Sequence, residues 1–251
     1  MKLIAHRGGS FGLENSLEAI LTAACIGADA IECDIRRTKD GELVIYHDSN
    51  LSRLTGQDIE VCDMTYHEMQ DVLQQFGQQP LTFTQLMEGY HAHAPILLHI
   101  KLDGYDESFA RTVVNSGLPL IVGVVSQEML QCFSALLPRQ NILAFLPSPG
   151  DVDTFYRGGA GILRLWEQWL GDITPEDVKR RYPDAEVFIM ACNMAEKAGE
   201  EIPLQCMDGS FESLDRAKHL GADGMLLNNI EMALAWRAQQ TEISAASTPR
   251  I

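Results

Sequence analysis

The chain has 251 residues, with 19 lysines and arginines against 35 aspartates and glutamates, which gives a formal net charge of −16. A field of this sign opposes nucleic acid and anionic membrane surfaces, so neither is expected as the main partner. The 46% hydrophobic and 22% charged composition is ordinary for a soluble globular protein. An anionic small-molecule substrate would need a local positive site.

No sequence feature indicates export or membrane insertion. The first residues, MKLIAHRGGS, reach histidine, arginine and glycine too soon for a signal peptide. No apolar run approaches the roughly 18 residues of a membrane span. The cysteines lack CxxC spacing and read as reduced core residues. They stand at positions 25, 33, 62, 132, 192 and 206. We therefore expect a cytoplasmic protein.

Nine short apolar runs recur along the chain, most of them followed by an amphipathic helical pattern. They cover residues 3–6, 30–35, 43–46, 95–102, 118–126, 141–147, 160–166, 186–192 and 223–228. Runs that do not alternate indicate strands buried on both faces, as in a parallel sheet. Repeated βα units in a chain of this size predict an α/β fold, a (β/α)8 TIM barrel, as one domain over residues 1–240.

One of the nine runs does not fit a parallel barrel. The run at 30–35 continues through Arg36 and Arg37, and only TKDGE (38–42) then separates it from the run at 43–46. A parallel connection needs about a dozen residues, whereas Asp40-Gly41 is a strong signal for a two-residue hairpin loop. The run at 43–46 is therefore predicted to fold back antiparallel, as a β-hairpin excursion after the second strand.

The hairpin predicts which side chains meet. A two-residue loop places Lys39 opposite Glu42 and, counting outwards, Asp34 opposite His47. Opposite residues share a face of the sheet, as do residues two apart on one strand. Glu32, Asp34 and His47 are therefore expected to converge.

Two further segments lie outside the predicted barrel strands. Residues 50–94 form the longest such stretch and are expected to make a small cap beside the barrel mouth. The polar, small-residue tail at 241–251 is expected to be disordered.

Charged and titratable side chains gather at the carboxyl ends of the first three predicted barrel strands, where active sites of such barrels lie. They are His6 and Arg7, Glu32 and Asp34, and His99 and Lys101, joined by His47 from the hairpin. Two ionised carboxylates in a barrel mouth would be costly without a cation. Two histidines can supply an acid and a base, and an arginine and a lysine can hold a phosphoryl group.

A competing motif is GGSFG (8–12), which fits the G-x-S-x-G nucleophile elbow of serine hydrolases, with Ser10 as nucleophile. It follows the first predicted strand, whereas that fold has other strands before its elbow. We favour the interpretation that these glycines let backbone N–H groups approach an anion.

The assembled residues resemble the glycerophosphodiester phosphodiesterase family. The matching stretches are AHRGGSFGLENSLEAI, GADAIECDIRRTKDGELVIYHDSNLSRLTG, PLTFTQLME, LLHIKL and LGADGMLL. The first two are long and specific, and the match covers most of the first hundred residues. The resemblance implies a TIM barrel that hydrolyses a glycerophosphodiester-like small molecule to an alcohol and a phosphomonoester, with one divalent cation, Mg²⁺ or Ca²⁺.

The resemblance also implies roles. His6 and His47 look like the catalytic acid and base, and Glu32 and Asp34 like metal ligands. Arg7 and Lys101 look like phosphate ligands, and Glu14-Asn15 matches a substrate-binding Glu-Asn pair of the family.

Three positions depart from the family pattern. His99 stands where the family has a glutamate that completes the metal site, so Mn²⁺ or Zn²⁺ becomes an alternative to Mg²⁺ or Ca²⁺. Ala191-Cys192 replaces a Trp-Thr pair, and Leu227-Asn228 replaces Thr-Asp. These departures keep a second hypothesis open, a degenerate barrel that binds phosphorylated ligands without hydrolysing them.

Overall fold

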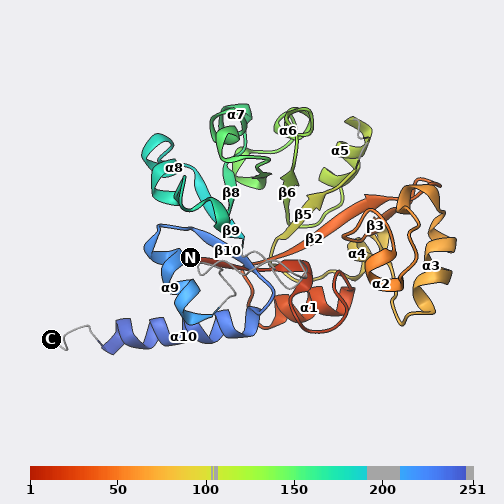
Figure 1. Cartoon of the computed structure of the whole chain (residues 1–251), viewed down its shortest axis with the longest axis horizontal. Coiled ribbons are helices and arrows are strands. Elements are labelled where there is room, and N and C mark those ends of the chain that lie inside the picture. Colours follow the sequence, from red (N-terminus) through yellow and green to blue (C-terminus); the bar gives the residue numbers. More distant parts are fainter. Residues whose placement is uncertain (103, 105–106, 191–209, 247–251) are drawn as a thin grey trace.

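The structure is a computed structural model that describes residues 1–102, 104, 107–190 and 210–246. Eight strands pair in parallel with their neighbours, and both β2 and β10 pair with β1, which closes the barrel (Figure 1). They are β1 (Lys2–Ala5), β2 (Ala30–Arg37), β5 (Ile96–Ile100), β6 (Leu120–Val124), β7 (Ile142–Phe145), β8 (Ile162–Trp166), β9 (Glu186–Met190) and β10 (Gly224–Leu227). The predicted TIM barrel is confirmed.

Helices surround the barrel and alternate with its strands (Figure 1). They are α1 (Leu17–Cys25), α4 (Phe83–Gly89), α5 (Glu107–Val114), α6 (Gln127–Ser134), α7 (Val152–Gly158), α8 (Pro175–Arg181), α9 (Phe211–His219) and α10 (Ile230–Ala246). Several begin where a serine or threonine accepts a hydrogen bond from the first turn, as Ser16 does for α1 and Ser126 for α6. The sequence thus encodes the strand-to-helix turns locally.

Alternation along the strands divides the core into two parts. Ile31, Cys33 and Ile35 of β2 pack in the outer cluster between strands and helices. Side chains of the opposite parity fill the barrel interior. This interior cluster comprises Ile4, Ala30, Leu97, Ile121, Leu143, Phe145, Ile162, Phe188 and Leu226. Glu32 and Asp34 alternate with the outer set and therefore point inwards.

The hairpin forms as predicted, but its register was predicted wrongly by one residue. Ile35 of β2 lies opposite Ile45 of β3 (Leu43–Ile45), so Asp34 faces Tyr46 and not His47. The loop has three residues, because Gly41 adopts a left-handed conformation with φ 90°. A turn followed by a left-handed glycine is the favoured three-residue hairpin loop. His47 therefore lies beyond the end of β3.

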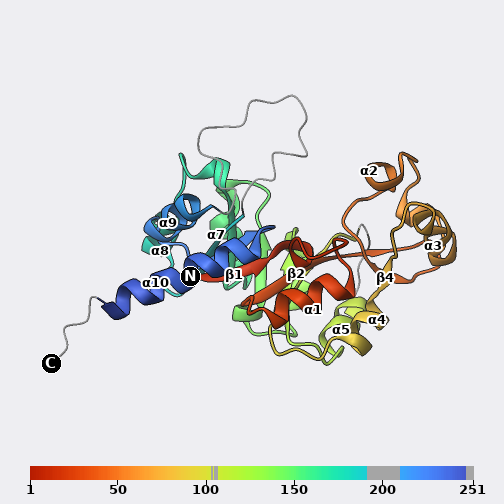
Figure 2. The same cartoon turned by 90° about the horizontal axis from the view of Figure 1, so that it is seen from below.

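A small lobe stands beside the barrel (Figure 2). It contains α2 (Ser52–Thr55), the short helix η2 (Val61–Asp63), α3 (Tyr66–Gln74) and the strand β4 (Leu81–Thr82), which pairs with β3. Its own apolar cluster is Val44, Tyr46, Leu51, Val61, Met64, Met69 and Leu73. Phe83 and Leu86 of α4 pack instead in the main core. The lobe therefore ends before α4, earlier than the 50–94 segment expected from sequence.

The C-terminal segment is helical for longer than the sequence pattern indicated. Helix α10 continues to Ala246 and so includes residues 241–246 of the segment that was expected to be disordered. Their composition, Thr-Glu-Ile-Ser-Ala-Ala, contains no glycine or proline to end the helix. Residues 247–251 lie outside the described residues. Among the described helices, none combines the length and apolarity that crossing a membrane requires.

The conformation of Gly41 predicts the cost of replacing it. A left-handed backbone costs a residue with a Cβ about 1 kcal/mol or more, so Gly41→Ala should lower the free energy of unfolding by about that amount. Gly171→Ala is the matched control, because Gly171 has no positive φ and its added Cβ meets no atom within 4 Å. Denaturant titration measures both. Equal stability of the two variants would contradict the three-residue loop.

Candidate active site

The loop after β1 is held in a strained conformation. Arg7 and Asn15 have φ angles of 52° and 58°, the positive-φ residues other than glycine in the described chain. Each costs about 1 kcal/mol. The backbone N–H of Asn15 donates to the carbonyl of Arg7 at 2.9 Å, which pins the two strained residues together. Their side chains are thereby directed at the carboxyl end of β2.

Two carboxylates of β2 lie at the centre of the site. Glu32 and Asp34 are 1% and 0% exposed. The backbone N–H of Arg7 donates to Glu32 Oε2 at 3.0 Å. The side-chain amide of Asn15 donates to Asp34 Oδ2 at 3.2 Å and accepts from the backbone N–H of Asp34 at 3.2 Å. The first loop thus supplies hydrogen bonds to both buried carboxylates.

His99 completes a candidate metal site. It lies beside Asp34 in the β2–β5 register, and its Nδ1 is 3.2 Å from Asp34 Oδ1 and 3.6 Å from Glu32 Oε1. Glu32, Asp34 and His99 each offer one ligand atom, and these atoms lie within 4.8 Å of one another. Two carboxylate oxygens and an imidazole nitrogen at this spacing fit a divalent cation.

A stacking contact fixes the His99 ring. It lies on the ring of Phe145 with centroids 3.7 Å apart and planes 16° from parallel. Gly123 makes this possible, because a Cβ there would come within 2.4 Å of the Phe145 ring. His99 is therefore oriented by its packing as well as by the carboxylates.

Positive groups keep Asp34 ionised. Burial by itself would raise the pKa of Asp34, but the hydrogen bond from His99 and the charge of Lys101 hold that pKa well below its ordinary value. The Lys101 ammonium lies 3.0 Å from Asp34 Oδ1, and Arg7 Nε lies 3.7 Å from Asp34 Oδ2. Asp34 is thus an anion at neutral pH.

His6 is buried beside Glu32, with its Nε2 3.8 Å from Glu32 Oε2. Its Nδ1 lies 2.7 Å from Oδ1 of Asn228, which follows β10. Burial lowers the pKa of His6 below its ordinary value, although the Glu32 charge opposes the shift. A neutral imidazole results, with Nδ1 donating to Asn228 and Nε2 left as the basic atom.

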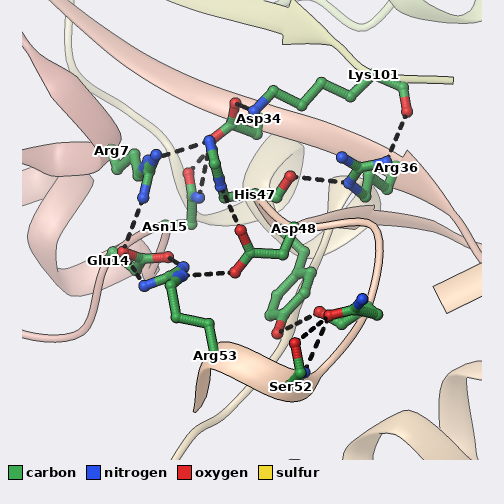
Figure 3. Close-up of polar contacts among 12 residues, drawn as sticks. Arg7, Glu14, Asn15, Asp34, Arg36, His47, Asp48, Ser52, Arg53 and Lys101 are labelled. Atoms are coloured by element: carbon green, nitrogen blue, oxygen red, sulfur yellow. Dashed lines mark hydrogen bonds and ion pairs between the residues drawn. The ribbon is translucent and has the colours of Figure 1, made fainter. Parts of the chain in front are cut away.

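His47 lies near Asp34 and is held by the neighbouring Asp48. Its Nδ1 lies 2.7 Å from Asp48 Oδ1, and its carbonyl accepts a hydrogen bond from Arg36 Nε at 2.8 Å. The charge of His47 contributes to the lowered pKa of Asp34. Figure 3 shows the imidazole between the carboxylates of Asp34 and Asp48. Thus His47 lies near Asp34 through the chain path after β3 and not through the predicted hairpin register.

Glu14 connects the first loop to the lobe. It accepts from Arg7 Nη1 at 3.1 Å and from the guanidinium of Arg53 on α2 (Figure 3). Arg53 also donates to Asp48 at 2.6 Å. Burial opposes ionisation of Asp48, but its hydrogen bonds with His47 and Arg53 lower its pKa to about 2. The lobe therefore braces both Glu14 and the partner of His47.

The structure brings the nine predicted site residues into one network. They are His6, Arg7, Glu14, Asn15, Glu32, Asp34, His47, His99 and Lys101. Sequence reasoning missed Asp48 and Arg53 and treated Asn228 only as a departure. The sequence could have indicated Asp48, because it is an acid directly after a predicted catalytic histidine. No sequence pattern indicated Arg53.

Two other sequence interpretations have different outcomes. Ser10 is exposed, and it lacks the positive φ that the serine of a nucleophile elbow has. In this loop Arg7 has the positive φ. His6 and His47 bond Asn228 and Asp48 rather than this serine. These contacts do not support a serine hydrolase. The departure at Ala191-Cys192 lies outside the described residues.

Comparison with known proteins gives both sequence and fold relatives. A model of the glycerophosphoryl diester phosphodiesterase family matches residues 6–131. The chain is 32% identical to human lysophospholipase D GDPD1 over 143 residues, 56% of this chain and 42% of that protein. It is 41% identical to a glycerophosphodiester phosphodiesterase of Caldanaerobacter subterraneus over 80 residues, 31% of this chain and 33% of that one. The chain spans less than half the length of these curated relatives.

Solved structures resemble the fold over nearly the whole chain. A phosphodiesterase of Oleispira antarctica, in complex with the product sn-glycerol-3-phosphate, aligns with a TM-score of 0.72 at 20% identity, covering 95% of this chain and 97% of that one. A glycerophosphodiester phosphodiesterase of Thermotoga maritima aligns with a TM-score of 0.69 at 21% identity, covering 93% and 96%. At such identities the likeness concerns the fold.

The contact between His6 and Asn228 predicts a measurable shift. Asn228→Asp places a carboxylate 2.7 Å from Nδ1, which favours the imidazolium and should raise the pKa of His6. NMR titration of the protein in chelator measures the pKa. Asn229→Asp is the matched control, because the Asn229 side chain accepts from the Met232 N–H at 3.1 Å rather than from His6. An unchanged His6 pKa in Asn228→Asp would show that the contact is absent in solution.

Proposed function

Because the chain belongs to the glycerophosphoryl diester phosphodiesterase family, we propose that it hydrolyses a glycerophosphodiester to an alcohol and glycerol 3-phosphate. The observation that carries the proposal is the approach of two histidines, His6 and His47, to one buried pair of carboxylates. A structural relative solved with sn-glycerol-3-phosphate as product supports the choice of product.

Glu32, Asp34 and His99 would hold the metal. A divalent cation there would offset charge on a non-bridging phosphate oxygen. Mg²⁺ and Ca²⁺ prefer oxygen ligands, whereas imidazole suits Mn²⁺ or Zn²⁺. We propose that His99, in place of a third carboxylate, weakens Mg²⁺ and Ca²⁺ binding and favours Mn²⁺ or Zn²⁺.

Arg7 and Lys101 would bind the phosphate of the substrate. Both are held at the carboxylates, Arg7 by Glu14 and Asp34 and Lys101 by Asp34. Their positions are thus fixed before substrate arrives, which is the condition for stabilising charge that develops during reaction. Guanidinium and ammonium groups are the usual phosphate ligands among side chains.

His6 and His47 would divide the proton transfers. His6 is kept neutral by burial and presents a basic Nε2, which suits deprotonation of the nucleophile. The Asp48 carboxylate holds His47 at Nδ1, so Nε2 is the atom that would protonate the departing alkoxide. Asp48 and Asn228 thus act as positioning residues for the two imidazoles.

A barrel that binds phosphorylated ligands without hydrolysis is the competing function, and His99 at the metal site favours it. The two functions are separated by a panel of glycerophosphodiesters assayed with each divalent cation and with chelator. Hydrolysis that chelator abolishes supports the phosphodiesterase. Binding with no turnover under any of these conditions supports the competing function.

Removal of either histidine should reduce turnover with the fold intact. General acid–base catalysis contributes about 10²–10⁴-fold, so His6→Ala and His47→Ala should each lower kcat/KM by at least about 10². His67→Ala is the control, because the His67 side chain is 81% exposed. Circular dichroism checks folding. Near-full activity in both active-site variants would contradict the assignment.

The metal proposal predicts that substitution of His99 reverses the preference between Mn²⁺ and Mg²⁺. His99→Glu adds a hard oxygen ligand and a negative charge, so it should tighten Mg²⁺ binding by about tenfold or more and reduce the preference for Mn²⁺. Calorimetric titration of each metal into wild type and variant measures both effects, with His67→Glu as a control for added charge. Tight Mg²⁺ binding by wild type that the variant leaves unchanged would rule out a role for His99.

A further inference from the structure

A buried arginine that the mechanism does not use lies in the barrel interior. Arg164 is the middle residue of β8 and is 4% exposed. In the register it lies beside Phe145 of β7 and Phe188 of β9. Both phenylalanines belong to the interior cluster. Because residues at the same register position share a face, the Arg164 side chain lies inside the barrel.

Aromatic rings hold the Arg164 guanidinium by its faces. Its Cζ lies 4.0 Å from the centre of the Trp166 ring, 5.1 Å from Phe145 and 5.9 Å from Trp169. Stacking of this kind leaves the N–H donors, which point outwards in the guanidinium plane, available for hydrogen bonds. Nε and Nη1 find no hydrogen-bond partner among the residues that the structure describes.

A buried cation with two N–H groups that find no partner among the described residues is costly, and a structural role alone does not require one. Leaving a charged donor buried and unsatisfied costs several kcal/mol, and a methionine or leucine would fill the same space. Burial lowers the pKa of Arg164 to about 9, so the group is still charged at neutral pH. An arginine kept in this state is suited to an anionic ligand that arrives from outside.

Arg164 adjoins the candidate metal site without belonging to it. The Phe145 ring stacks on His99 and also contacts the Arg164 guanidinium. The cations at the carboxylates are already engaged there, Lys101 by Asp34 and Arg7 by Glu14. Arg7, Lys101 and the metal would serve the scissile phosphate. Arg164 is separated from them by the Phe145 ring, so it is not needed at that phosphate.

We propose that Arg164 binds an anionic group, a carboxylate or a phosphate, carried by the alcohol part of the phosphodiester. The inference rests on the proposed function and specifies its substrate class. It also gives the chain, with its net charge of −16, a local positive site for a substrate that has more than one negative group. The aromatic rings around Arg164 exclude water and strengthen such an ion pair.

Matched substrate pairs test the proposal. Glycerophosphoserine differs from glycerophosphoethanolamine by one carboxylate, and glycerophosphoinositol 4-phosphate differs from glycerophosphoinositol by one phosphate. Wild type should prefer the anionic member of at least one pair, and the pair identifies which group is bound. Arg164→Met should lower kcat/KM for that anionic member by about ten- to a hundredfold, the worth of a charged hydrogen bond, and change the other member less than about twofold.

Two further variants control for structure. Arg164→Lys keeps the charge and should restore part of the preference. Arg139→Met removes another arginine stacked on a ring, with Cζ 4.1 Å from the centre of Tyr156, but Arg139 precedes β7 at the opposite end of the barrel and its loss should leave the preference unchanged. Equal losses on both members of each pair, or no loss, would overturn the proposal.

A binding measurement keeps the test independent of turnover. The same four diesters are titrated calorimetrically into His47→Ala protein, with and without Arg164→Met. Preferential binding of an anionic member that disappears with Arg164→Met supports the subsite even if wild type hydrolyses none of the diesters, a result that would refute only the proposed function. Absence of any preference in binding and in turnover would refute the subsite.

Discussion

The buried carboxylate pair of Glu32 and Asp34 is the constraint on which the rest of the site depends. Two neighbouring anions that are 1% and 0% exposed are unstable unless positive charge and hydrogen bonds surround them. The strained loop after β1, the imidazole of His99 and the ammonium of Lys101 all meet this requirement. The same arrangement surrounds the candidate metal site with hydrogen-bond donors and positive charge.

The lobe beside the barrel takes part in this electrostatic arrangement. Arg53 of α2 pairs with Glu14, which also accepts from Arg7, and with Asp48, which holds His47. The lobe has its own apolar cluster, so the helix that carries Arg53 is packed separately from the barrel core. The hairpin connects the lobe to β2, and its insertion between barrel strands therefore brings Arg53 to Glu14 and Asp48.

Aromatic packing connects the candidate metal site to Arg164. Phe145 stacks on His99 on the metal side and contacts Arg164 on the other, and Gly123 leaves the space that the ring needs. A histidine at position 99 can stack on such a ring, which a carboxylate cannot do. The change at the metal site and the aromatic wall beside it thus form one packing arrangement.

The sequence by itself determined the barrel, the antiparallel excursion and the nine residues that converge, because strand burial, turn chemistry and strand-end position are local patterns. It did not determine the hairpin register, since one left-handed glycine, Gly41, turns a two-residue loop into three. Nor did it reveal that Asn228 orients His6 across the closing strand, that Arg53 braces Glu14, or that Phe145 lies between His99 and Arg164. Those contacts join residues far apart in the chain, and only closure of the barrel and packing of the lobe bring them within bonding distance.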